Sequence, residues 1–129
     1  MMRPGMESPQ APRRILVVDD SLDAAQTFAL LLATMGHQAE FVTDPRTAVD
    51  TARRLQVEIV FLDIGMPGLD GYQVARMLRQ TFGRELRIVA VTAYGDDQHR
   101  RRSRESGFDA HVLKPPDLAI VQSILVTLF

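Results

Sequence analysis

Hydrophobic and polar residues follow two distinct patterns along the chain. Short continuous apolar runs, such as residues 15–18 and 59–62, are typical of strands buried on both faces of a sheet. Between them lie longer segments in which apolar residues return every three or four positions, as in a helix with one buried face. In residues 21–35 this spacing involves Leu22, Ala25, Phe28, Ala29, Leu32 and Met35, and Gly36 follows as the residue that ends the helix.

These patterns predict five strands that alternate with five helices. The strands are expected at residues 14–18, 38–42, 58–63, 86–93 and 108–114. Fully apolar strands separated by helices indicate a parallel sheet covered on both faces. We therefore predict an α/β fold: a doubly wound, five-stranded parallel sheet of the flavodoxin-like (βα)5 type, with strand order 2-1-3-4-5. Residues 1–12 show no periodicity and are expected to be a flexible tail before one domain at 13–129.

Acidic residues stand at the ends of two of these strands. Asp19 and Asp20 follow the first strand, and Asp63 ends the third. With the predicted strand order these two strands are neighbours, so the three carboxylates should meet at one edge of the sheet. Unit charges about 4 Å apart repel by roughly 4 kcal/mol at an effective dielectric near 20, so a cluster needs a neutralising partner. A Mg²⁺ ion with oxygen ligands is such a partner. Alternatively, Asp19 only ends a strand and Asp20 caps a helix, but this leaves Asp63 unexplained.

The fourth and fifth strands end in a hydroxyl and an ammonium group. Thr92 closes the fourth strand and Lys114 closes the fifth. Taken singly, Thr92 is an ordinary β-branched strand residue and Lys114 a solvated strand end. Taken with the three acids, they form a site suited to a phosphoryl group, whose oxygens a cation neutralises and a hydroxyl hydrogen-bonds. A carboxylate in such a site can serve as the nucleophile and form an aspartyl phosphate.

Four short motifs give these features a common context. They are VVDDS at 17–21, FLDIGMPGLDG at 61–71, VTA at 91–93 and LKPP at 113–116, each at the carboxyl end of a predicted strand. In this order and spacing they resemble the receiver domain of two-component response regulators, and most closely the receivers attached to hybrid sensor kinases. The resemblance covers residues 14–129 and implies a signalling switch that is phosphorylated on an aspartate. Catalysis would be limited to its own phosphorylation and dephosphorylation.

The resemblance implies a role for each acidic residue. Asp63 would be the phosphoacceptor, and Mg²⁺ the cofactor. The implied ligands are the carboxylates of Asp20 and Asp63 and the backbone carbonyl of Gly65, with Asp19 acting mainly through ordered water. Four further residues would shape the loop over the site without doing chemistry: Pro67, Gly68, Asp70 and Gly71.

The same resemblance implies a switch around the phosphate. Thr92 would be the hydroxyl that moves toward the phosphate, and Lys114 would pair with it, followed by a cis bond to Pro115. The family usually carries an aromatic switch residue three positions before this lysine, where this chain has His111. A histidine could change its charge near neutral pH; the alternative is a strand residue without a role. Tyr94, two residues after Thr92, is expected to influence how fast the phosphate is hydrolysed.

The implied partners are a histidine kinase or a histidine phosphotransfer protein as donor, and an output protein that the sequence does not identify. Output would run through the face of the fourth helix, fifth strand and fifth helix, and a homodimer through this face is a further option. The net charge of −1 argues against direct DNA binding, although residues 95–107 carry four arginines and no apolar residue. The absence of Cys excludes disulfides, and the absence of a long apolar run predicts a cytoplasmic protein without membrane contact. His37 and His99 are interpreted as ordinary surface residues.

Three other functions fit parts of the pattern. A haloacid dehalogenase-type phosphatase would need an acid two positions after its nucleophile, where this chain has Leu22 after Asp20 and Gly65 after Asp63. A flavodoxin-like FMN-binding protein would need a Ser/Thr/Gly-rich phosphate loop where this chain has acids. A receiver-like interaction module that works without phosphorylation remains as the main alternative. Both a stand-alone regulator and a receiver taken from a hybrid kinase fit the sequence.

Overall fold

The apolar runs form a single parallel sheet. The structure, a computed structural model, describes residues 11–66, 70–93, 101 and 105–129. Its strands are β1 (Arg14–Val18), β2 (Gln38–Val42), β3 (Ile59–Asp63), β4 (Arg87–Thr92) and β5 (Ala110–Leu113). They are arranged in the order β2-β1-β3-β4-β5 with parallel neighbours throughout. The predicted fold class and strand order are confirmed.

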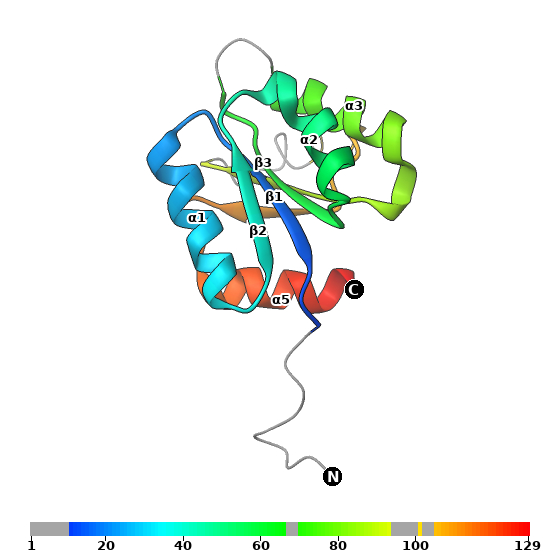
Figure 1. Ribbon diagram of the computed structural model, residues 1–129. Helices are drawn as coiled ribbons and strands as arrows, with labels where there is room; N and C mark the ends of the chain where they lie inside the picture. The colour runs from blue at the N-terminus through cyan, green and yellow to red at the C-terminus, as the bar shows by residue number, and fades with distance from the viewer. Residues whose placement is uncertain (1–10, 67–69, 94–100, 102–104) are drawn as a thin grey trace.

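Helices cover both faces of the sheet (Figure 1). They are α1 (Leu22–Thr34), α2 (Ala48–Leu55), α3 (Gly71–Phe82) and α5 (Leu118–Leu128), with two 3₁₀ turns at Pro45–Thr47 and Gly83–Glu85. The predicted helix at 95–107 falls largely outside the described residues, as do positions 1–10 of the predicted tail. None of the helices that the structure describes combines the length and apolar character required to cross a bilayer.

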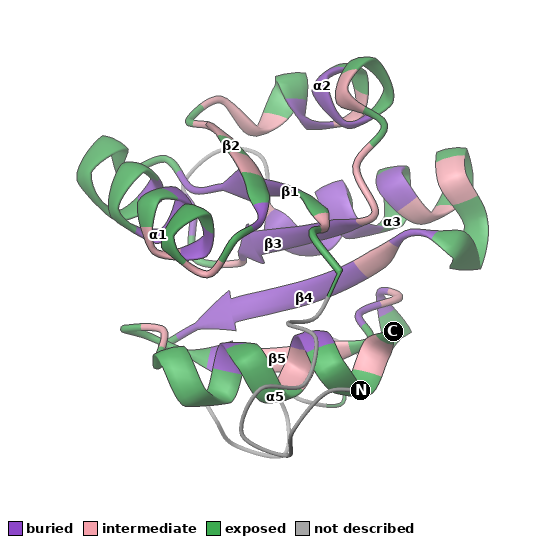
Figure 2. Cartoon of the chain, turned by 60° about the horizontal axis from the view of Figure 1, so that its bottom comes forward, coloured by how far each residue is buried: buried purple, intermediate pink, exposed green. Residues whose placement is uncertain are grey.

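Each face of the sheet has its own hydrophobic cluster, and Figure 2 shows the central strands coloured as buried. One cluster joins α1 and α5 to the sheet, and in it the Phe28 and Phe61 rings meet edge to face with centroids 5.0 Å apart. The other joins α2 and α3 to the opposite face, and Val74, Ala75 and Leu78 of α3 are fully buried there. The central strands are therefore shielded from solvent on both faces, which explains why their sequences are continuous apolar runs.

Polar side chains set the starts of the helices. Ser21 caps α1, and its hydroxyl accepts a hydrogen bond from the backbone N–H of Ala24 at 3.3 Å. Asp117 caps α5 by accepting the N–H groups of two residues in the first turn. The predicted helix start at Asp44 is a 3₁₀ turn that leads into α2, with Asp44 as its cap. Leu22 belongs to the apolar stripe of α1 but is 55% exposed, because the first turn of α1 lies beyond the end of β1.

His37 is buried, which corrects the interpretation of this residue as a surface histidine. It follows Gly36, whose φ of 97° turns the chain from α1 into β2, and it is 7% exposed. Its Nδ1 accepts a hydrogen bond from the backbone N–H of Arg13 at 3.0 Å, and the backbone N–H of His37 donates to the carbonyl of Leu32 at 3.2 Å. The sequence does not reveal this role, because the acceptor site forms only when the start of β1 comes beside the turn. His99 lies outside the described residues.

The burial of His37 predicts a loss of stability in mild acid. Burial, and secondarily the positive charge of Arg13, lowers its pKa from the ordinary value of 6.5. As the pH falls through 6.5, this imidazole therefore gains a proton more readily in the unfolded chain than in the folded one. We expect the free energy of unfolding, measured with urea, to decrease between about pH 8 and about pH 5. His37→Gln keeps a side-chain acceptor but cannot titrate, so it should show a smaller decrease; an equal decrease would contradict the assignment.

Candidate functional site

The three acidic residues meet at the carboxyl edge of the sheet, where β1 and β3 end side by side. Val18 pairs with Leu62 in the register of these strands, so Asp19 and Asp63 follow as neighbours. Carboxylate oxygens of Asp19, Asp20 and Asp63 lie within 4.8 Å of one another. Asp19 and Asp63 are 7% and 4% exposed, whereas Asp20 is open to solvent. The structure thus brings together the three carboxylates that the sequence predicts to be neighbours.

Asp19 is held in a position that disfavours its charge. Its Oδ1 accepts the backbone N–H of Ser21 at 2.9 Å, which orients the carboxylate toward the cluster. Burial is the largest influence and raises the pKa of Asp19, and the neighbouring Asp63 carboxylate raises it further. The Ser21 hydrogen bond and the Lys114 charge act in the opposite direction. The cluster therefore gains stability from a bound proton or cation. Asp20 does not cap α1, because Ser21 occupies that position.

Each oxygen of the Asp63 carboxylate has a partner. The Lys114 ammonium lies 2.9 Å from Oδ2, and the backbone N–H of Gly65 donates to Oδ1 at 2.9 Å. Lys114 is placed by its own backbone N–H, which donates to the Thr92 carbonyl at 2.9 Å, and its bond to Pro115 is cis. The Asp63 side chain is 5% exposed and that of Lys114 is 35% exposed, so solvent reaches this ion pair from the lysine side.

Thr92 lies at the same edge, at the end of β4. It is 2% exposed, and it follows Val91, the residue that pairs with Asp63 in the sheet register. Gly65 is exposed beside the cluster, and a Cβ added to it would lie 3.5 Å from Asp63 Oδ1. A donor set of several carboxylates, with an exposed backbone segment beside it, fits a hard divalent cation such as Mg²⁺.

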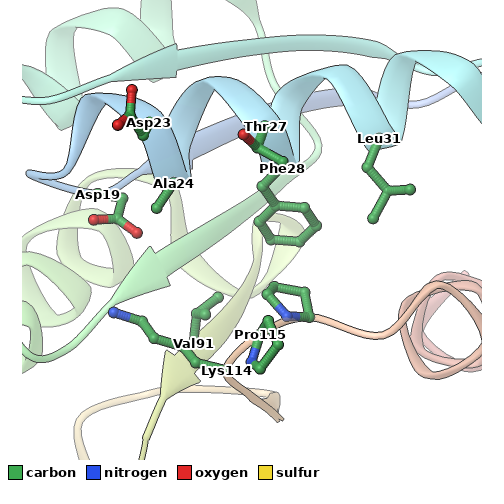
Figure 3. A pocket seen from close by; sticks show the side chains of 10 residues that line it. Asp19, Asp23, Ala24, Thr27, Phe28, Leu31, Val91, Lys114 and Pro115 are labelled. Carbon is green, nitrogen blue, oxygen red and sulfur yellow. The ribbon is translucent and has the colours of Figure 1, made fainter.

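An apolar groove opens directly beside the acids (Figure 3). It has a volume of about 610 Å³ and separates α1 from the segment that follows β5. Asp19 and Lys114 line one end, and the remaining lining is mainly apolar, including Ala24, Phe28, Leu31, Pro115 and Pro116. Sequence reasoning missed this groove, since its two walls come from segments far apart in the chain and only the fold brings them together.

The structure describes only some of the residues that were predicted to modulate the site or shape its loop. His111 is half-buried in β5, next to Ala90 of β4. Tyr94, Pro67 and Gly68 lie outside the described residues. Two predicted loop residues instead belong to the start of α3: Asp70 is its cap, in a capping box with Gln73, and Gly71 is its first residue.

Comparisons with known proteins agree with this geometry. The family model described as response regulator receiver domain matches residues 15–125. The sensor histidine kinase RcsC of Escherichia coli (strain K12) is 32% identical over 111 residues, which cover 86% of this chain and 12% of the kinase. The DNA-binding response regulator MtrA of Mycobacterium leprae (strain TN) is 35% identical over 103 residues, covering 80% of this chain and 45% of MtrA. The chain thus spans less than half the length of each of these two relatives.

Solved structures share the fold. The chemotaxis protein CheY4 of Vibrio cholerae superposes with a TM-score of 0.85 at 22% identity, over 92% of this chain and 100% of that chain. A two-component response regulator of the LuxR family from Aurantimonas sp. SI85-9A1 superposes with a TM-score of 0.81 at 27% identity, over 92% of this chain and 86% of that chain.

Proposed function

Because the chain belongs to the response regulator receiver domain family, we propose that it is the phosphoacceptor switch of a two-component system or phosphorelay, phosphorylated on Asp63. The observation that carries this proposal is the Asp63 carboxylate itself. It is buried at the sheet edge, between the ammonium of Lys114 and two further carboxylates. A buried acid in such surroundings is well placed to be a nucleophile, and it is poorly explained as part of a structural ion pair alone.

The proposed chemistry is a phosphoryl transfer from a phosphohistidine to Asp63. A carboxylate oxygen of Asp63 forms the new P–O bond, the P–N bond of the donor breaks, and its electron pair stays on the imidazole, which takes up a proton. Lys114 moves from Asp63 Oδ2 to a phosphoryl oxygen, and the Thr92 hydroxyl donates a hydrogen bond to another. Asp19, Asp20, Asp63 and the Gly65 carbonyl would hold Mg²⁺, which when bound offsets the negative charge of the phosphoryl oxygens and the acids.

Intact mass after incubation with acetyl phosphate tests the proposal. We expect one phosphoryl adduct with Mg²⁺ and none after chelation with EDTA. Because an aspartyl phosphate can hydrolyse before it is detected, binding of beryllofluoride should be measured in parallel. If neither an adduct nor beryllofluoride binding is found with Mg²⁺ present, the chain would instead be a receiver-like interaction module that works without phosphorylation.

We further propose that a histidine kinase or histidine phosphotransfer protein docks over the apolar groove. A donor must bring its phosphohistidine within bonding distance of Asp63, so its surface also covers what surrounds the acids. The groove shares Asp19 and Lys114 with the site and extends along α1 to Leu31. A helix of the donor with an apolar face fits this lining, and a basic group on it would complement Asp23 at the groove's acidic end.

Two alanines of α1 allow a matched test of the docking surface. Ala24 and Ala33 are both exposed on α1, but only Ala24 lines the groove. We expect Ala24→Tyr to slow phosphoryl transfer from a phosphorylated histidine phosphotransfer protein by about tenfold, equivalent to ~1.4 kcal/mol of docking energy. Ala33→Tyr should not slow it. Acetyl phosphate does not need the groove, so Ala24→Tyr should reduce the rate of phosphorylation by acetyl phosphate less. Equal reductions of the rate with both donors would contradict docking in the groove.

For output, we propose the face that includes β5 and α5; the fourth helix expected in this face, at residues 95–107, lies largely outside the described residues. His111 lies on β5, and Leu113, Leu118 and Ile120 are each about half exposed on this strand and on α5. Exposed apolar side chains that gather near one another are typical of a surface that binds a protein partner, so the position of these three residues is a further part of the proposal.

A further inference from the structure

Helix α3 starts in direct contact with the backbone that carries Asp63. Gly71, the first residue of α3, has no side chain, and a Cβ added there would lie 2.5 Å from the Ile64 Cα and 2.7 Å from the Asp63 carbonyl oxygen. Both distances are far below van der Waals contact. The two obstructing atoms belong to the backbone and cannot rotate away as a flexible side chain would. Any residue larger than glycine at this position therefore forces either α3 or the Asp63–Ile64 backbone to move.

The helix is held more firmly than the segment it touches. Tyr72, Val74, Ala75 and Leu78 are buried in the cluster on this face of the sheet. At the far end of α3, the Arg79 guanidinium donates to the carbonyls of Gly83, Leu86 and Gly107 at 2.6–2.7 Å and pairs with Asp109 at 2.9 Å. The first turn is fixed as well, because Asp70 accepts the N–H of Tyr72 at 2.7 Å while Gln73 accepts that of Asp70 at 3.1 Å.

The backbone after Asp63 is held by the packing of Ile64 and of the buried Met66 against the same cluster, but Gly65 between them has few restraints. The Ile64 N–H makes a hydrogen bond of 3.2 Å to the Val91 carbonyl, which continues the pairing of β3 with β4. Gly65 then lies exposed, and its N–H is the donor to Asp63 Oδ1. A collision at Gly71 would therefore shift the Ile64–Gly65 backbone relative to the first turn of α3. This displacement would move the donor that orients the Asp63 carboxylate.

We propose that Gly71 is a positioning residue for the phosphoacceptor: its missing side chain lets α3 rest against Asp63 and Ile64, and this contact fixes the orientation of the Asp63 carboxylate and of the Gly65 backbone. The inference rests on the proposed function and extends it, since a residue that touches neither phosphate nor metal sets the geometry for both. Loss of a group that orients a metal ligand typically weakens metal binding about 10- to 100-fold.

Gly71→Ala tests this role, and Mg²⁺ affinity measured by calorimetry is the first readout. At a helix position with free space around it, replacing glycine by alanine stabilises the helix, because alanine has the higher helix propensity. Here we expect Mg²⁺ and beryllofluoride to bind roughly 10- to 100-fold more weakly than to the wild type. We also expect faster hydrogen exchange at the Ile64 amide, as its bond to Val91 weakens. The control is Val121→Ala, which removes buried side-chain atoms in the cluster on the opposite face and should lower stability without weakening Mg²⁺ binding.

The outcomes separate this inference from the proposed function. If the wild type binds neither Mg²⁺ nor beryllofluoride, the proposed function fails. If the wild type binds both, and Gly71→Ala binds them as tightly as Val121→Ala does, the positioning role is wrong. If Gly71→Ala does not fold, Asp70→Ala decides, because it loosens the first turn of α3 without adding an atom. Weaker Mg²⁺ binding by Asp70→Ala would support the role, and unchanged binding would overturn it.

Discussion

Replacement of Asp63 by asparagine is expected to abolish the phosphoryl adduct formed from acetyl phosphate and Mg²⁺. The amide oxygen carries no negative charge and is a poor nucleophile, while the size of the side chain stays almost the same. The change also removes one of the three clustered carboxylates, so Mg²⁺ should bind more weakly. Since the Asp63 carboxylate contributes to the raised pKa of Asp19, that pKa should fall in the variant. Intact mass measures the adduct, and NMR titration measures the pKa.

The matched control is Asp50→Asn, the same chemical change at an exposed aspartate of α2 that pairs with Arg53. It should form the adduct at the wild-type rate. An adduct that persists in Asp63→Asn would show that another group accepts the phosphoryl. In that case borohydride reduction and peptide mapping would identify it, with Asp19 and Asp20 as the first residues to inspect.

Lys114→Met should slow phosphorylation by acetyl phosphate by about 100- to 1,000-fold, the usual loss when one group that stabilises developing charge is removed. Methionine keeps an unbranched side chain of similar length but cannot neutralise a phosphoryl oxygen. The rate of adduct formation with saturating Mg²⁺ measures the effect. A rate within about twofold of the wild type, less than 0.5 kcal/mol in the barrier, would mean that Lys114 serves only the unphosphorylated state.

The same variant should also reveal what Lys114 does before phosphorylation. Without a divalent cation, its loss leaves the buried Asp63 carboxylate without the ammonium 2.9 Å away. We expect a loss of about 1–2 kcal/mol in the free energy of unfolding, rather than the ~3–5 kcal/mol of a fully buried pair, since Lys114 is partly exposed. The variant also lacks the ammonium that competes with metal, so added Mg²⁺ should stabilise it more than the wild type. Urea unfolding with and without Mg²⁺ measures both effects.

The features that could be predicted from sequence are those that depend on local pattern. Continuous apolar runs mark strands buried on both faces, and a parallel sheet places the residues after neighbouring strands at one edge. This reasoning predicts that Asp19 and Asp63 are neighbours and that Thr92 lies beside Lys114. In each case the residue lies at the end of a strand, so strand order alone decides its neighbours.

The features that could not be predicted depend on contacts between distant segments. Nothing beside His37 in the sequence indicates that Arg13 will use it as an acceptor. The sequence contains Gly71, but only the packing of α3 on Ile64 shows why a larger residue does not fit. Leu22 follows the helical pattern, yet it is exposed. The pattern alone does not show that the first turn of α1 lies beyond the end of the sheet. Such contacts require the three-dimensional arrangement.

The two outermost strands, β2 and β5, also decide how readily the sheet could pair with a strand of another protein molecule. An open sheet has two edges whose free N–H and C=O groups could template a strand from another molecule. Here β5 has only four residues and is followed closely by Pro115 and Pro116, which carry no N–H to extend a ladder. At the other edge, β2 exposes Gln38 and Glu40 along its length. We therefore expect the short, proline-flanked strand at one edge and the exposed polar side chains at the other to disfavour the addition of a strand from another molecule.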